Sequence, residues 1–240
     1  VFEQEFPPIK AMILIKGGSV KLLDSKGEHL DFMHDLDVRV DLNPGAKVLT
    51  KKVIAKLTGT RGNVVLIGDA APPKNGSRKW GDLFWKTQIN LNNIDFEKIL
   101  PLLPPGLEAE TLKGTGTFVL QFDGAKNGKI NVVSQVNVKN AAFSAGVLKG
   151  DNPKMSEFQL FAQGHHQEGN IQIQQFKLNS DYATASFSGS VDKGMQINGG
   201  GEAIINLAEV SQNFANSLGL QEGLSLRKGD LNLSIEGVKE

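Results

Sequence analysis

The sequence contains no cysteine, a single tyrosine, and no excess of charge of either sign. Without cysteine, the chain has neither a disulfide framework nor thiolate metal sites. Lysine plus arginine and aspartate plus glutamate number 26 each, so the formal net charge is zero. Proteins that bind mainly nucleic acid carry a basic surplus that neutralises phosphates. The charge balance therefore argues against nucleic acid as a main partner.

Long apolar runs are also missing. No stretch approaches the ~20 apolar residues of a membrane-spanning helix, and no charged segment precedes an apolar core as in a signal peptide. The chain begins with Val1 rather than methionine, so we expect a processed protein or a segment of a longer one. At 240 residues, with 40% hydrophobic and 22% charged residues, it can fold as one large domain or two small ones.

The dominant pattern that is present is one-sided alternation. In Leu36–Leu42, apolar residues alternate with charged ones, the period of a strand with one apolar and one solvated face. About fourteen such strands follow one another at the roughly 8–12-residue spacing of an antiparallel meander. Their short connections favour pairing between sequence neighbours. The sequence therefore predicts an all-β, mostly antiparallel fold.

Glycines and phase changes divide the pattern. Gly17–Gly18 is interpreted as a turn between the strands Met12–Ile15 and Val20–Leu23, and Ala142–Leu148 as a separate, weaker strand. The apolar phase changes across Gln174–Gln175, which indicates a β-bulge there.

Two short helical patterns interrupt the strands. Asp95 is a plausible N-cap for a pattern that runs to Leu103, and Asn206 precedes a second pattern that runs to Leu218 and stops at Gly219. Helices this short are marginal alone, so we expect each to lean on the sheet and plug an open end.

Each helical pattern leads, through a Lys-Gly pair, into a clean alternating strand that closes on glycine. Because Asn90–Gly124 and Ile205–Gly237 share this plan, we expect two β-groove units, 1–124 and 125–240, or one continuous elongated domain. A single curved, open sheet with two short helices accommodates either division.

Residues with catalytic or metal-binding chemistry do not gather into a motif. His165 and His166 are adjacent, and neighbours on a strand point to opposite faces, so they do not chelate one metal. Gly164 and Gly169 bracket them, which favours a solvated loop. With no metal site, cofactor motif or nucleophile motif, the sequence favours a non-enzymatic protein without cofactors.

The informative signal is the apolar face that many strands share. Two such faces pressed together would form a closed β-sandwich, whereas a single curved sheet would leave an apolar groove. We expect the following residues to line the groove: Phe118, Leu120, Phe122, Phe187, Leu231, Leu233 and Ile235.

The order of these features resembles the AsmA-like family (AsmA, TamB and YhdP). The resemblance rests on the repeated Asn-Leu, short helix, Lys-Gly and alternating strand in Asn90–Gly124 and Ile205–Gly237, and on the "LDVRVDL" strand of Leu36–Leu42. It implies a repeating β-groove protein of the Gram-negative envelope that carries phospholipid through the periplasm toward the outer membrane. Members are usually anchored in the inner membrane, so this chain would be a soluble segment of such a protein, with envelope proteins as partners at the groove ends.

A second reading of the same strands remains open. A closed β-sandwich could serve as a binding or adhesion module that recognises glycan or protein through loops such as Ala70–Gly81.

Overall fold

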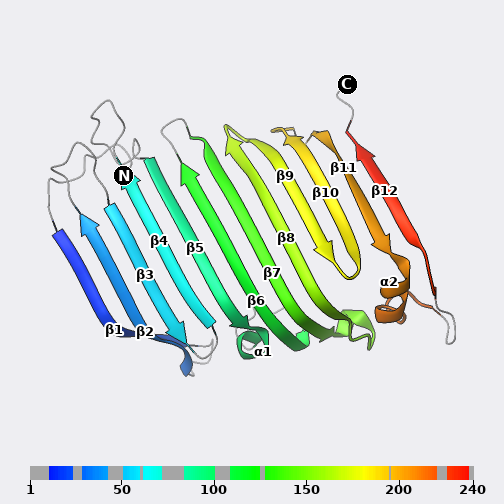
Figure 1. Cartoon of the computed structure of the whole chain (residues 1–240), viewed down its shortest axis with the longest axis horizontal. Helices are drawn as coiled ribbons and strands as arrows, with labels where there is room; N and C mark the ends of the chain where they lie inside the picture. Colours follow the sequence, from blue (N-terminus) through cyan, green and yellow to red (C-terminus); the bar gives the residue numbers. More distant parts are fainter. Residues whose placement is uncertain are drawn as a thin grey trace.

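Twelve strands form one sheet whose order follows the chain from β1 to β12 (Figure 1). The computed structural model describes residues 11–23, 29–42, 51–59, 62–71, 84–100, 109–124, 128–194, 196–220 and 226–237. All recorded strand pairs are antiparallel. The expected all-β, antiparallel, open sheet with two short helices is confirmed.

The strand bounds are β1 Ala11–Leu23, β2 His29–Leu42, β3 Lys51–Gly59, β4 Gly62–Ala71, β5 Phe84–Asp95, β6 Ala109–Gly124, β7 Ile130–Ala145, β8 Lys154–Gln167, β9 Asn170–Ser180, β10 Ala183–Val191, β11 Ile197–Asn206 and β12 Asp230–Glu236.

Within the described residues, the twelve strands are fewer and longer than the about fourteen expected from the spacing of the pattern. Strand β1 passes through Gly17 rather than turning there: Gly17 adopts a φ of 62°, and its N–H donates to Asp37 Oδ1 at 3.1 Å. The pairing with β2 shifts at this point, so the expected turn is wrong and the feature is a β-bulge. Ala142 belongs to β7, which ends at Ala145 before a short 3-10 turn.

Bulges keep the apolar residues on one face. Gln163 pairs with Gln175 while Gly164 pairs with Ile173, so Gln174 is the extra residue and the expected bulge is confirmed. Asn93 and Asn140 sit at two further register shifts, with φ of 53° and 52°. Asparagine tolerates this left-handed conformation better than most residues. Each extra residue shifts the alternation by one position. Without it, the apolar side chains in the rest of the strand would point to the opposite face.

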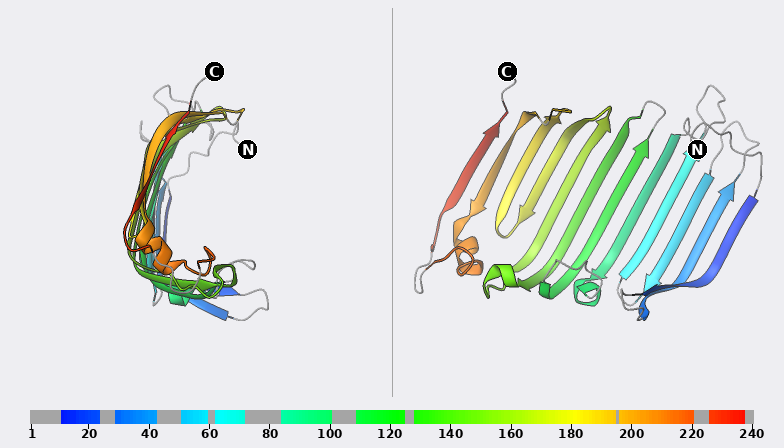
Figure 2. Two further views of the ribbon diagram at one scale, coloured as in Figure 1. Left: turned by 90° about the vertical axis from the view of Figure 1, so that its right-hand side faces the viewer. Right: turned by 180° about the vertical axis from the view of Figure 1, so that it is seen from behind.

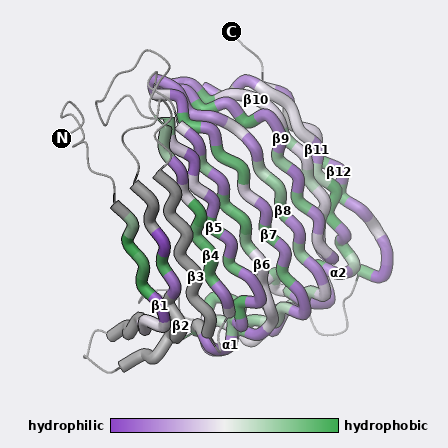
Figure 3. The backbone as a smooth tube through the Cα atoms, turned by 60° about the vertical axis from the view of Figure 1, so that its left-hand side comes forward, coloured by the Kyte–Doolittle hydropathy of each residue, from purple (hydrophilic) through white to green (hydrophobic). Residues whose placement is uncertain are grey.

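Directly paired residues of an antiparallel ladder point to the same face, so one row can be followed from β4 to β12. Its members are Val64, Leu91, Phe118, Val136, Leu160, Leu178, Ala185, Ala203 and Leu233. Every member is apolar. Figure 3 shows the accompanying alternation of apolar and polar residues along individual strands.

Each strand is arched, so the sheet has the cross-section of a trough. Figure 2 (left) shows this cross-section in a view along the direction from β12 to β1. The N–H of Gly237 donates to the oxygen of Gly199, so the backbone groups of Gly199 face β12. Strand β11 runs downward in Figure 1, and for L-residues this places the Gly199 and Ala203 face away from the viewer, on the concave side. The apolar row therefore lines the inside of the trough.

Glycines allow this curvature where strands approach closely on the concave face. Gly164, Gly189 and Gly199 lie on one row, linked through Ile173. A Cβ on Gly189 would stand 2.6 Å from the oxygen of Asn198, a distance that real side chains do not reach. Missing side chains at such positions let a sheet bend sharply.

Two helices follow strands along the lower edge of the trough. Helix α1, Phe96–Ile99, is capped by Asp95, whose Oδ1 accepts from the N–H of Glu97 at 3.2 Å. Helix α2, Leu207–Asn213, is capped by Asn206 in the same way. The N-cap at Asp95 is as predicted, and α2 begins directly after Asn206, where the second helical pattern was expected to open. Helix α2 ends at Asn213, before the expected end at Leu218. The expected end of the first helix, Leu103, lies outside the described residues.

The sheet continues without a break across position 124. Strands β6 and β7 pair from Ala109 and Ala145 to Gly124 and Ile130, joining the units expected at 1–124 and 125–240 into one layer. Because the strands form this single layer, the closed β-sandwich is not the fold of the described residues.

We predict that Gly199→Ala destabilises the sheet. Its Cβ would lie 2.5 Å from the Cα of Gly189 and still closer to the Ser188 oxygen, so the backbone must move apart. The expected loss is about 1–3 kcal/mol in free energy of unfolding, measured by urea denaturation. Gly194→Ala, whose nearest neighbour is a flexible Asp192 oxygen at 3.3 Å, is the control and should stay within about 0.5 kcal/mol. Equal stability of both variants would contradict the role of glycine in the bend.

Candidate functional site

The concave face brings together the residues expected to line a groove. Phe118, Leu120 and Phe122 occupy alternate positions on β6 and share one face. A second row starts at Leu120 and crosses Ser134, Ala162, Phe176, Phe187 and Gly201 to the register position of Ile235. Leu231 and Leu233 alternate with Ile235 along β12. The side chain of Ile235 lies outside the description.

The face is apolar but poorly covered. In the described part of the chain, helix α1 packs against β5 and β6, and helix α2 against β11 and β12, both along the lower edge of the trough. Leu231 and Leu233 are 42% and 43% exposed, and the three β6 residues are half-buried. Monomeric soluble proteins rarely leave an apolar surface of this continuity uncovered unless it binds something.

Helix α1 covers part of the lower edge of the concave face. The ring of Phe96 lies where Gly116 has no side chain, since a Cβ there would meet Phe96 Cζ at 2.7 Å. The rings of Phe96 and Phe118 lie 6.2 Å apart between centroids. The buried hydrophobic cluster of the described residues consists of Ile94, Phe96, Val138 and Ala141. The trough is therefore best packed under α1 and progressively more open toward β12.

Helix α2 and the turn after it are tied to the loop between β7 and β8. The Asp151 carboxylate accepts from the Asn216 N–H at 3.1 Å, and from the N–H and hydroxyl of Ser217 at 2.7 Å each. The rings of Tyr182 and Phe214 meet edge to face, 5.3 Å apart. The Asp151 hydrogen bonds cross more than sixty residues of sequence, and together with the ring contact they hold the α2 segment against the lower edge of the trough.

The pKa of the Asp151 carboxyl reflects two opposing influences. Desolvation of this buried group raises its pKa, and the hydrogen bonds from Ser217 and Asn216 lower it. The hydrogen bonds prevail, so the pKa of Asp151 lies below its ordinary value. The ionised carboxylate is therefore the form that holds the α2 segment.

A notch of about 280 Å³ opens in the concave face near β12. It forms because Gly201 and the small Ala185 and Ala203 stand beside Phe176 and Phe187 in the register. Its exposed lining is almost wholly apolar. A notch with this lining suits a methyl terminus or a branch of a hydrocarbon chain, and offers no group that would orient a polar ligand.

The structure corrects the interpretation of the histidine pair. His165 and His166 lie in β8 rather than in a loop, and the turn comes later, at Glu168 and Gly169. They face opposite sides of the sheet, as adjacent strand residues do. Among the described residues, no group of three or more His, Asp or Glu side chains lies close enough to hold a metal ion.

Several lining residues were not expected from the sequence. Ile89 and Leu91 on β5, Leu160 on β8 and Phe176 on β9 share the concave face with Phe118. Period-two alternation marks them as strand residues, but the bulges at Asn93 and Gln174 hide which phase is concave. Only the register settles it.

No family model, curated protein or solved structure matches this chain. Within the described residues, no helix is long and apolar enough to cross a bilayer. The concave face is thus the basis for assigning a function.

We predict that Asp151→Asn lowers the melting temperature at pH 7 by weakening the hold on α2. A carboxyl with a depressed folded-state pKa contributes stability above its unfolded pKa of about 3.9, and loses it as the pH falls through the folded value. The difference between variant and wild type should therefore shrink as the pH is lowered from 5 toward about 3. Calorimetric melts across this range check it, and a difference that is independent of pH would contradict the ionic origin.

Proposed function

We propose that the concave face binds the acyl chains of phospholipid or another acyl-chain lipid, and that the chain is a non-enzymatic, lipid-conducting segment of a cell-envelope protein. The observation that carries the proposal is the row of apolar residues that crosses the trough from β4 to β12 without a polar interruption. Acyl chains are the ligands that gain most from such a surface, because the gain scales with the apolar area removed from water.

The length of the trough favours a conduit over a pocket for one small molecule. Twelve strands at about 4.8 Å spacing make the sheet about 53 Å long. A single acyl layer is about half of a ~30 Å hydrocarbon core. Several lipids therefore fit in line, or one lipid can occupy successive positions along the trough.

The cross-section supports the same proposal. A trough with an apolar inside and a polar outside shields acyl chains while the open mouth leaves a headgroup in water. Transport between the inner and outer membrane through the periplasm, with envelope proteins at the groove ends, is the part of the proposal that rests on the AsmA-like resemblance. The alternative function, an adhesion module, was based on a closed sandwich, and the described strands form a single sheet instead. Most of its expected binding loop, Ala70–Gly81, lies outside the described residues.

The first test compares Leu120→Asp on the concave face with Gln121→Asp, its neighbour on the opposite face. Phospholipid extracted from the purified proteins is quantified by mass spectrometry. We expect Leu120→Asp to lose lipid at least about tenfold, since an aspartate among acyl chains costs about 2.5–3.5 kcal/mol. Its melting temperature should fall by no more than about 4 °C, because water reaches the charge in an open trough. Gln121→Asp should retain both lipid and stability.

Two outcomes would contradict the proposal. One is a wild-type protein that carries no lipid and takes up none from phospholipid vesicles. The other is equal lipid loss in both variants, which would mean that the concave face is not the binding surface.

A second pair tests conduction along the trough rather than binding alone. Leu233→Asp interrupts the apolar row on β12, and Ser234→Asp alters the other face of that strand. In a vesicle-to-vesicle assay with a fluorescent phospholipid, Leu233→Asp should slow transfer at least about fivefold while Phe118 and its neighbours still bind lipid. Unchanged transfer by Leu233→Asp would mean that lipid does not travel along the row to β12.

A further inference from the structure

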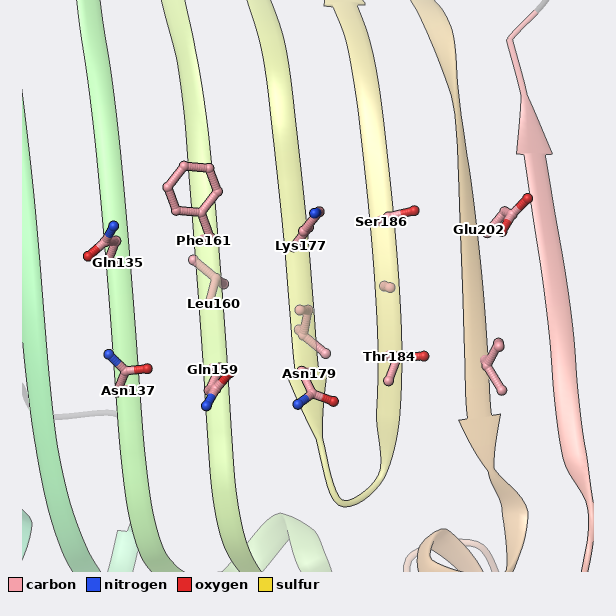
Figure 4. A pocket seen from close by; sticks show the side chains of 13 residues that line it. Gln135, Asn137, Gln159, Leu160, Phe161, Lys177, Asn179, Thr184, Ser186 and Glu202 are labelled. Carbon is pink, nitrogen blue, oxygen red and sulfur yellow. The ribbon is translucent and has the colours of Figure 1, made fainter.

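The opposite, convex face carries a second candidate site. A shallow hollow of about 560 Å³ extends over β7 to β11 (Figure 4). Two rows of the register form it: one crosses Gln135, Phe161, Lys177, Ser186 and Glu202, and the other crosses Asn137, Gln159, Asn179, Thr184 and Ile204. Its volume lies within the range of small-ligand sites.

The hollow exists because β10 presents only short side chains on this face. Thr184 and Ser186 lie between the longer Lys177 and Asn179 of β9 and Glu202 and Ile204 of β11. The result is a channel along β10, with Ala185 in its floor. Figure 4 shows Lys177 and Asn179 on one side of Thr184 and Ser186, and Glu202 on the other.

The polar groups of the hollow are neutral as a set. Lys177 and Glu202 flank Ser186 on opposite sides, about 10 Å apart across two strand spacings, so their charges balance. The other polar lining groups are amides and hydroxyls, and each offers both donors and an acceptor. Within the described part of the chain, the side chains of Gln135, Asn137 and Asn179 hydrogen-bond to no other protein group, whereas Gln159 donates to Glu157 at 2.8 Å.

Apolar groups stand among these donors and acceptors. Phe161 is a half-buried aromatic ring that lies between Gln135 and Lys177 in the register. Ile204 is 46% exposed on the far side of the channel. An aromatic ring beside amides and hydroxyls suits a ligand that has apolar C–H faces and many hydroxyl groups.

We propose that this hollow binds a neutral oligosaccharide, with Phe161 under a sugar ring and the amides and hydroxyls of β9 and β10 on its hydroxyl groups. An anionic ligand is disfavoured because Glu202 offsets Lys177. A peptide is disfavoured because β8 to β11 already pair on both sides, so no backbone is open for strand addition. The site is separate from the concave face, because the two lie on opposite sides of one sheet.

The test titrates the ¹⁵N-labelled protein with three neutral hexasaccharides: maltohexaose, cellohexaose and the β-1,4-linked hexamer of N-acetylglucosamine. A tryptic digest of casein is the peptide arm. For a shallow site we expect a dissociation constant of about 1 mM for at least one sugar, so titration extends to about 10 mM. The amide signals that move should belong to residues 159–161, 177–179 and 184–186.

Three variants decide whether the hollow is responsible. Phe161→Ala removes the ring, Asn179→Ala removes one exposed amide, and Thr184→Arg fills the channel with a long side chain. Each should weaken binding at least about tenfold, the effect of losing one ring contact or buried hydrogen bond. Gln121→Ala, on the same face but outside the hollow, is the control and should bind as the wild type does.

Asn179 and Thr184 are exposed, so these two variants keep the test valid if Phe161→Ala fails to fold. The proposal is overturned if none of the three sugars moves these signals, or if all three variants bind like Gln121→Ala. It is equally overturned if only the casein peptides bind, or if the signals that move belong to the concave row of Phe118 and Leu120.

Discussion

The constraint on which the structure depends is the phase of the antiparallel ladder. A strand that slips by one residue in its pairing moves its apolar side chains to the other face of the sheet. In a single-layer sheet these side chains would then face water. The nine strands from β4 to β12 nevertheless keep Val64 and Leu233 on the same side. Bulges at Asn93, Asn140 and Gln174 achieve this by absorbing the extra residues where strand lengths disagree. The apolar interior of the trough is the direct product of this phase.

The second requirement is curvature of the sheet, which depends on glycine residues on the concave face. Gly164, Gly189 and Gly199 leave room for close backbone approach on the concave side, and Gly116 makes space for the ring of Phe96. The first set bends the sheet, and the last lets α1 settle onto it. Without the bend, the same apolar face would be flat and open to pairing with another sheet. The glycines therefore favour a curved trough over a flat sheet that could pack against a second sheet as a sandwich does.

Much of this fold follows from the sequence, because period-two alternation and N-cap chemistry are local. Asp95 and Asn206 mark the starts of both helices, and the phase change at Gln174 marks its bulge. Gly17 was misread because a glycine with positive φ serves a turn and a bulge equally well. Alternation alone also left trough and sandwich open, since both need one apolar face. The convex hollow was invisible, because it depends on short β10 side chains lying between longer ones of β9 and β11.

Pairing only between sequence neighbours has a consequence for how such a sheet can change in evolution. Among the described residues each strand pairs only with its sequence neighbours, so adding or removing one hairpin leaves the remaining cross-section intact. Each hairpin changes the length by two strand spacings, about 10 Å. Length is therefore set by the number of hairpins and width by the glycine row, and the two can vary independently. Duplication or deletion of short gene segments can therefore lengthen or shorten a trough of this design without changing its cross-section.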